Sequence, residues 1–325
     1  MSSPRRGVAR RPSRGVALLA AAVIVAAPAP GLRSDSPQEA RIKLDVALVL
    51  VEATVKNRAG RVLGDLKQED FRVSEDGTEQ QIAHFSRDQL PLAVALVVDL
   101  SSSIEPFLRP LRYATLTTLK TLKEEDEVAL FTFSTGVERR VALTRDKREV
   151  ADEIEFFATS GSTNINDGVY HAARYLHEER PAARRVIILV SDNVPTERGR
   201  ADHRRVVEAA LEADTAVYSI RVPGRNPHLA RLHARAAGMG FVNVSKLCEE
   251  TGGEMFDIEK EGTLTQAFQT LIERLKTRYT LGYYPANHAR DGRFRALEVR
   301  LGAPFGAKGK DYSIVSKRGY YSSRG

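Results

Sequence analysis

The sequence has almost no cysteine: Cys248 is the single one among 325 residues. No internal disulfide can form, so the hydrophobic core must stabilise the fold. Cys248 lies in a helical pattern, VSKLCEE, where a small buried side chain is expected. A catalytic or metal-binding role is therefore not predicted for this thiol.

Long hydrophobic runs are also missing. The N-terminal apolar run, Val16–Ala27, has twelve residues and is too short to span a bilayer comfortably. Arginines precede this run and the small residues of APAPG follow it, which is the shape of a secretory signal. We predict a signal peptide over residues 1–31, a linker over residues 32–41, and a mature chain that is secreted or held in the periplasm or cell envelope. An uncleaved signal that serves as a membrane anchor is the alternative.

Acidic residues are absent from the first 33 positions, which hold six arginines. The formal net charge of the chain is +7, and removal of residues 1–31 with five of these arginines lowers it to +2. A nucleic-acid partner, which a strongly basic chain would suggest, therefore loses most of its support.

Motifs of common hydrolases and nucleotide-binding proteins do not occur in the sequence. There is no GxSxG nucleophile elbow and no GxxxxGK[ST] phosphate loop, and the seven histidines are scattered along the chain. A serine hydrolase or a P-loop phosphotransferase is therefore not expected.

The sequence does contain a long series of alternating strand and helix patterns, over residues 91–279. The continuous apolar run Ala93–Val98 is typical of a strand buried on both faces. A helix pattern over residues 104–123 follows, and further strand patterns, such as Arg185–Val190, alternate with helix patterns up to Lys276. Repeated β/α alternation predicts the α/β class, with a doubly wound and mostly parallel sheet.

Strand-rich segments flank this region on both sides. Residues 42–90 include a hairpin signal at Asp76-Gly77, and residues 280–325 alternate as strands do. The first segment has too few strands to be stable alone. We expect the two segments to pack together beside the central sheet, as a small β-sandwich.

Oxygen-bearing side chains recur where the predicted strands end. Asp99 and Asp192 end two buried strands, at the edge of a parallel sheet where α/β folds bind ligands. Ser101 and Ser103 lie in the loop that enters the next helix, and Thr163 lies in a glycine-containing loop, SGSTN. Two carboxylates and three hydroxyls, with no His or Cys among them, suit Mg²⁺ or Mn²⁺ rather than zinc. Helix capping, by the two serines at one helix and by Asp192 at another, is the simpler interpretation, and both roles are compatible.

The order DxSxS, then Thr, then Asp resembles the metal-ion-dependent adhesion site of the von Willebrand factor A domain, over about residues 90–280. The flanking segments, including EATVKNRAGRVLGDLKQEDF before it and RYTLGYYP after it, look like the bacterial VWFA-related family first named from Acidobacteria. The resemblance implies a secreted or envelope-associated adhesion module, in which Asp99, Ser101, Ser103, Thr163 and Asp192 hold the cation. An octahedral ion held this way keeps positions for water, and the most suitable incoming ligand is a carboxylate of a protein partner. We therefore expect a binding protein and no enzyme.

Four points stay open from the sequence. The last aspartate of the motif is commonly followed by glycine, whereas Asn193 stands here; asparagine also tolerates a left-handed backbone. A metal-assisted hydrolase is one alternative, and it would need a general base near the metal site. Glu105 is the carboxylate nearest to the site along the chain, but its simpler role is that of an acidic residue at the start of a helix. Asp167 could likewise support the metal site or only begin a helix. Besides the metal-dependent binding module and the hydrolase, a third alternative is a scaffold domain that does not depend on metal.

Overall fold

The computed structural model describes residues 48–87, 90–197, 199–224, 242–302, 305 and 311–324. The predicted signal peptide and linker, and residues 42–47 of the first strand-rich segment, lie outside these ranges. Within them, no helix combines the length and the apolar character that crossing a bilayer would require.

A six-stranded sheet forms the centre of the fold, in the order β10-β9-β8-β5-β6-β7. Its strands are β5 (Leu92–Asp99), β6 (Glu127–Phe133), β7 (Val137–Thr144), β8 (Arg184–Ser191), β9 (Thr215–Arg221) and β10 (Met255–Asp257). All neighbours pair in parallel except β7, which runs antiparallel to β6 at one edge. The predicted doubly wound, mostly parallel sheet is confirmed.

The apolar run of β5 is continuous because the strand is buried on both faces. Val94, Leu96 and Val98 belong to one hydrophobic cluster, whereas Ala93, Ala95 and Val97 belong to a second. Successive side chains of a strand point to opposite faces, so each face of β5 needs its own apolar set.

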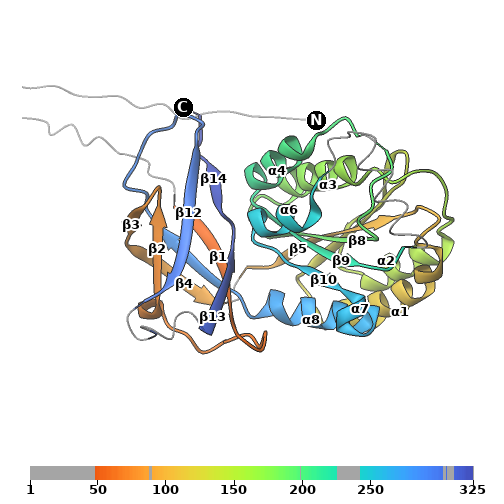
Figure 1. Ribbon diagram of the computed structural model, residues 1–325, viewed down its shortest axis with the longest axis horizontal. Helices are drawn as coiled ribbons and strands as arrows, with labels where there is room; N and C mark the ends of the chain where they lie inside the picture. Colours follow the sequence, from red (N-terminus) through yellow and green to blue (C-terminus); the bar gives the residue numbers. More distant parts are fainter. Residues whose placement is uncertain are drawn as a thin grey trace, which may run out of the picture. The chain divides into compact units, whose positions relative to one another are not determined.

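Helices cover both faces of this sheet (Figure 1). The first cluster includes side chains of α1 (Leu108–Thr118), α2 (Lys147–Glu153), α7 (Ile258–Glu261) and α8 (Leu264–Lys276). The second includes side chains of α3 (Ile165–Glu179), α4 (His203–Glu212) and α6 (Val244–Thr251). Asp or Asn side chains accept backbone N–H bonds at the starts of α2, α3, α4 and α6, as expected for N-caps.

The helix predicted over residues 104–123 is shorter than expected. It consists of α1 between two 3₁₀ turns, η2 (Glu105–Phe107) and η3 (Leu119–Thr121). Pro106 lies within η2, and proline has no N–H to donate inside a helix, which favours a late start of the α-helical part. Two further 3₁₀ turns are η1 (Gln68–Asp70) and η4 (Ile154–Phe156).

Strands from the two ends of the chain form two four-stranded antiparallel sheets. Their orders are β13-β1-β11-β4 and β14-β12-β2-β3, so each sheet interleaves early and late strands. The strands are β1 (Val49–Asn57), β2 (Phe71–Glu75), β3 (Thr78–Gln80), β4 (Ile82–Arg87), β11 (Tyr279–Tyr283), β12 (Phe294–Leu301), β13 (Tyr312–Ser316) and β14 (Gly319–Tyr321). Side chains of both sheets share one hydrophobic cluster, which contains Val51 of β1 and Val73 of β2. The expectation that flanking strands of both ends form additional β-structure is confirmed.

The hairpin signal at Asp76-Gly77 marks a two-residue turn between β2 and β3. Asp76 has φ 48° and Gly77 has φ 80°, the left-handed pair of a type I′ turn. The residues after this turn do not form one continuous strand, because they divide into β3 and β4, which belong to different sheets. The chain changes sheet at this point, as strands at the corners of packed sheets do.

Cys248 is buried in α6, with 1% of its surface exposed, and burial raises the pKa of its thiol. We expect the native protein to show no thiol that reacts with a disulfide reagent at pH 8, because the thiolate is the reactive form and the reagent cannot reach it. Unfolding in guanidinium should release one thiol per chain, measured by absorbance. Full reaction of the native protein at the rate of the unfolded chain would contradict the burial of Cys248.

Candidate metal centre

The candidate site lies at the carboxyl edge of the central sheet, between β5 and β8. Asp99 is the last residue of β5, and Asp192 directly follows β8. The two strands pair side by side, with Val98 opposite Val190. From β5 the chain continues to β6 on one side, whereas β8 lies on the other. Such a change of direction opens a crevice at the carboxyl ends of the strands, where α/β proteins bind ligands.

Backbone hydrogen bonds join the loops at this edge. The amide of Leu100, after β5, donates to the carbonyl of Phe133 at the end of β6 (2.8 Å), and the Leu100 carbonyl accepts from Ser160 (2.8 Å). The Thr163 carbonyl accepts from the amide of Thr196, in the loop after β8 (3.1 Å). The loops that carry the five predicted residues are therefore fixed to one another by the backbone.

Asp99 is the most deeply buried of the five, with no exposed surface. One carboxylate oxygen accepts from the Ser101 amide (2.8 Å), and the other accepts from the Ser191 hydroxyl (2.7 Å). Burial raises the pKa of Asp99 to about 6, against these hydrogen bonds, and the negative charge of Asp192 raises it further. Among the described residues, Asp99 has no Lys or Arg partner. The carboxylate thus lies in a position where a cation would stabilise its charged form.

The two serines of the motif lie together next to Asp99. Their hydroxyl oxygens are 2.9 Å apart, in the turn closed by a bond from the Ile104 amide to the Ser101 carbonyl (3.0 Å). Ser101 is buried and Ser103 is half-buried. Neither serine accepts a helix N–H in the cap of η2 or α1, so the capping interpretation does not apply to them.

Asp192 and Asn193 form the corresponding turn after β8. One oxygen of Asp192 accepts from the Val194 amide (2.9 Å). The other approaches Gly224 so closely that a Cβ there would lie 2.5 Å from it. Asn193 has φ 57°, so the left-handed backbone considered for this position is present. Its side-chain amide donates to the Ser219 hydroxyl of β9 (3.0 Å) and anchors the turn to the sheet.

Thr163 is buried, and its amide donates to the Thr196 hydroxyl (2.8 Å). Asp167 has no hydrogen bond with Thr163 or Thr196 among the described contacts. Its carboxylate accepts from the amides of Arg200 (3.1 Å) and Ala201 (3.0 Å), and these bonds lower its pKa although burial opposes them. Asp167 therefore holds the loop before α4 in place. Glu105, the other carboxylate considered from the sequence, is the exposed first residue of η2.

The sequence did not point to two serines that support the site. Ser191 donates to the Asp99 carboxylate, and Ser219 accepts from the side chain of Asn193, next to Asp192. A hydroxyl directly before Asp192 was a visible signal for Ser191. Nothing local marked Ser219, because it contacts Asn193 across 26 positions of the chain.

The chemistry of the site fits a hard cation. Within the described ranges, no three His, Cys, Asp or Glu side chains come together to hold a metal ion. A cation at this edge would therefore take hydroxyl oxygens and water besides Asp99 and Asp192, which is the ligand preference of Mg²⁺. Binding of the metal itself stays a prediction.

Comparison with known proteins identifies the central part of the chain. Residues 94–194 match the von Willebrand factor type A domain. This part of the chain is a von Willebrand factor A (VWA) domain. It includes β8, all but the first two residues of β5, and all five predicted ligands. No curated protein matches the chain.

Several solved structures are similar to this chain at low identity. One is an aerotolerance-related membrane protein from Bacteroides fragilis (13% identity, 57% of this chain and 98% of that chain, TM-score 0.44). Another is the PilB minor pilin from Streptococcus sanguinis (17%, 58% and 61%, TM-score 0.40). A third is the vWF domain of the type V pili tip protein Mfa5 from Porphyromonas gingivalis (12%, 57% and 95%, TM-score 0.41). With TM-scores below 0.5, these likenesses do not bear on what this chain binds.

Replacement of Asn193 tests the turn of the VWA domain after β8. We expect Asn193→Ala to lower the free energy of unfolding by about 1–2 kcal/mol, because alanine is strained at positive φ. Asn193→Gly should lose less, because glycine adopts this backbone freely and only the contact with Ser219 is lost. Urea unfolding measures both, and the control is Asn287→Ala, at an exposed residue that does not have positive φ and whose side chain accepts one backbone hydrogen bond, from Ala289 (3.1 Å). Equal losses for the alanine and glycine variants would show that the backbone of this turn is not strained.

Proposed function

We propose that this chain is a secreted or envelope-associated VWA protein that binds Mg²⁺ or Mn²⁺ through Asp99, Ser101, Ser103, Thr163 and Asp192. The observation that supports it is Asp99: a fully buried carboxylate, without a Lys or Arg partner among the described residues, beside two hydroxyls at the switch point of the sheet. A buried charge is expensive unless it is paired or coordinates a metal. A bound divalent cation would supply this compensation and act as a Lewis acid toward an incoming oxygen.

The same site suits recognition of a protein partner through an acidic side chain. Mg²⁺ keeps several waters when few protein carboxylates bind it, and an incoming carboxylate can replace one of them. The sequences of the flanking segments, which resemble the bacterial VWFA-related family, and the predicted signal peptide support such recognition at the cell surface or in the periplasm. A hydrolase is less well supported, because Glu105 begins η2 as a helix-start acid and no other base was evident in the sequence.

Metal binding is tested by thermal melting of the mature protein after EDTA treatment. We expect added Mg²⁺ or Mn²⁺ to raise the melting temperature of the wild type by several degrees, because an ion that binds only the folded state stabilises it. Asp99→Asn should abolish this shift. In EDTA the same variant should be at least as stable as the wild type, because it removes a buried negative charge beside Asp192. Asp99→Ala should also lose the shift.

Asp146→Asn is the matched control, because Asp146 caps α2 at the opposite edge of the sheet. This variant should keep the full metal-dependent shift. If the wild type shows neither a shift in melting nor heat in isothermal titration with Mg²⁺ and Mn²⁺, the domain is a scaffold that does not depend on metal.

Partner binding is tested by affinity capture from an envelope extract, with and without EDTA. We expect a protein that the wild type retains in Mg²⁺ and releases in EDTA, and that Asp99→Asn does not retain. Equal capture by the wild type and Asp99→Asn would show that recognition does not pass through the metal.

A further inference from the structure

Thr163 is the one proposed ligand that the strands of the central sheet do not position. The other four lie at the end of β5, in the turn after it, or directly after β8. Thr163 instead lies within residues 157–164, which connect η4 to α3 and belong to no helix or strand. Loops are in general held less firmly than the elements they connect. The place of the Thr163 hydroxyl therefore depends on the contacts of this loop.

Backbone hydrogen bonds hold the loop from two sides. The Thr163 carbonyl accepts from the amides of Thr196 (3.1 Å) and Glu197 (3.3 Å), in the loop after β8. On the other side, the Asn164 amide donates to the carbonyl of Ser134, in the loop between β6 and β7 (3.0 Å). The Thr163 hydroxyl makes no hydrogen bond with any residue that the structure describes, so it is available to a cation.

Ser162, directly before Thr163, joins the same two loops through its side chain. Its hydroxyl donates to the carboxylate of Glu197, and its oxygen lies 3.1 Å from the hydroxyl oxygen of Thr135, in the loop between β6 and β7. Because the proton of Ser162 is used toward Glu197, the Thr135 hydroxyl is the donor of the second bond. A chain of three side chains thus crosses the loop beside the proposed ligand.

Glu197 contributes the carboxylate of this chain of contacts. Its side chain is half-buried, and Ser162 is its only side-chain partner in the part of the chain that the structure describes. A hydrogen bond to a carboxylate is stronger than one to a neutral acceptor. The strongest side-chain contact of the loop is therefore made one residue away from Thr163.

We propose that Glu197 is a positioning residue of the metal centre, which acts through Ser162 to fix the place of the Thr163 hydroxyl. The proposal rests on the metal binding proposed above. Ligands of a metal ion are commonly oriented by a further layer of hydrogen-bonded groups, and the affinity for the metal depends on these groups. A loop that is already ordered also loses less conformational entropy when the ion binds.

Titration with Mn²⁺, with the free ion measured by electron paramagnetic resonance, tests this role. We expect Glu197→Ala to bind Mn²⁺ about tenfold more weakly than the wild type. Glu197→Gln should lose at most about threefold, because the amide oxygen of glutamine can still accept from Ser162. Ser162→Ala should match Glu197→Ala, and the double alanine variant should bind no more weakly than either, because both changes remove the same contact.

Glu125→Ala is the matched control. Glu125 is exposed and lies just before β6, at the opposite edge of the sheet, so this variant removes the same charge far from the site. It should bind Mn²⁺ as the wild type does. In EDTA the melting temperatures of all the variants should stay close to that of the wild type, because no core side chain is changed. A purely structural role of Glu197 would instead lower its melting temperature in EDTA.

The outcomes separate this proposal from the one on which it rests. If the wild type binds Mn²⁺ and Glu197→Ala binds it equally well, the role of Glu197 is overturned and metal binding stands. Equal losses in the alanine and glutamine variants would also overturn it, because the charge of Glu197 would then act rather than its hydrogen bond. A wild type that binds no Mn²⁺ would refute the metal centre itself, and the role of Glu197 with it.

Discussion

The parallel pairing of β5 with β8 is the constraint on which the candidate site depends. It brings the last residue of β5, Asp99, next to Ser191, the last residue of β8, and it places Asp192 just beyond. Both strands can lie in the middle of the sheet only because their side chains are apolar on both faces, with a helical layer over each. A polar substitution in either strand would disturb the site without touching a ligand. The hydroxyl and amide that hold Asp99 then fix its carboxylate in one orientation.

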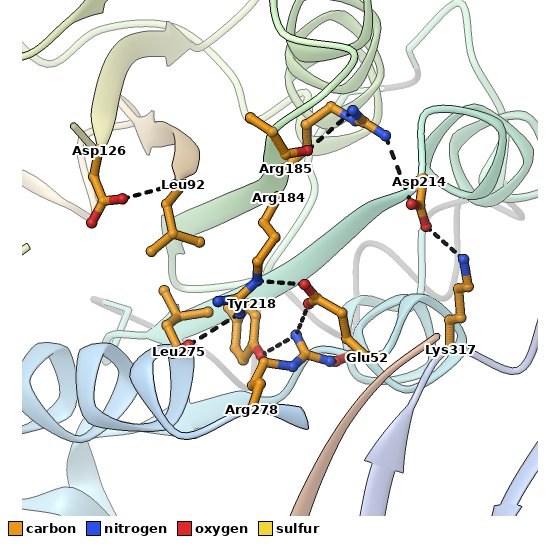
Figure 2. Close-up of polar contacts among 12 residues, drawn as sticks. Glu52, Leu92, Asp126, Arg184, Arg185, Asp214, Tyr218, Leu275, Arg278 and Lys317 are labelled. Atoms are coloured by element: carbon orange, nitrogen blue, oxygen red, sulfur yellow. Dashed lines mark hydrogen bonds and ion pairs between the residues drawn. The ribbon is translucent and has the colours of Figure 1, made fainter. Parts of the chain in front are cut away.

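Both ends of β8 carry buried charge, of opposite sign. Arg184 and Arg185 begin the strand, whereas Asp192 follows it and lies close enough to Asp99 to raise its pKa. At the carboxyl edge, hydroxyls and amides compensate the charge of Asp99 only in part, whereas at the amino edge Glu52 forms ion pairs with Arg184 and Arg278 (Figure 2). Buried charge has to be neutralised locally, and at the carboxyl edge the proposed cation would do this for Asp99 and Asp192.

The flanking strands connect the first and last parts of the described chain. β1 pairs with β11 and β13, and β12 pairs with β2, so neither end forms a sheet from its own strands alone. Glu52 extends this connection to the VWA domain, because it lies on β1 and its ion pairs reach Arg184 at the start of β8 and Arg278 between α8 and β11. The β-structure is therefore joined to the sheet at its amino edge, opposite the candidate metal centre.

The sequence by itself determined the elements and most of the candidate site. The two-faced apolar run before Asp99, the hydroxyls at Ser101 and Ser103 and the turn residues Asp76 and Asn193 are local patterns, and local patterns follow from backbone preference and side-chain periodicity. The tertiary structure alone decided that the residues after the Asp76-Gly77 turn divide into β3 and β4, that Ser191 lies beside Asp99, and that Glu52 pairs with two arginines. Glu52 and Arg184 are 132 positions apart, and their contact depends on which strands become neighbours. No periodicity encodes that choice, because it is made by the packing of whole elements around a common core.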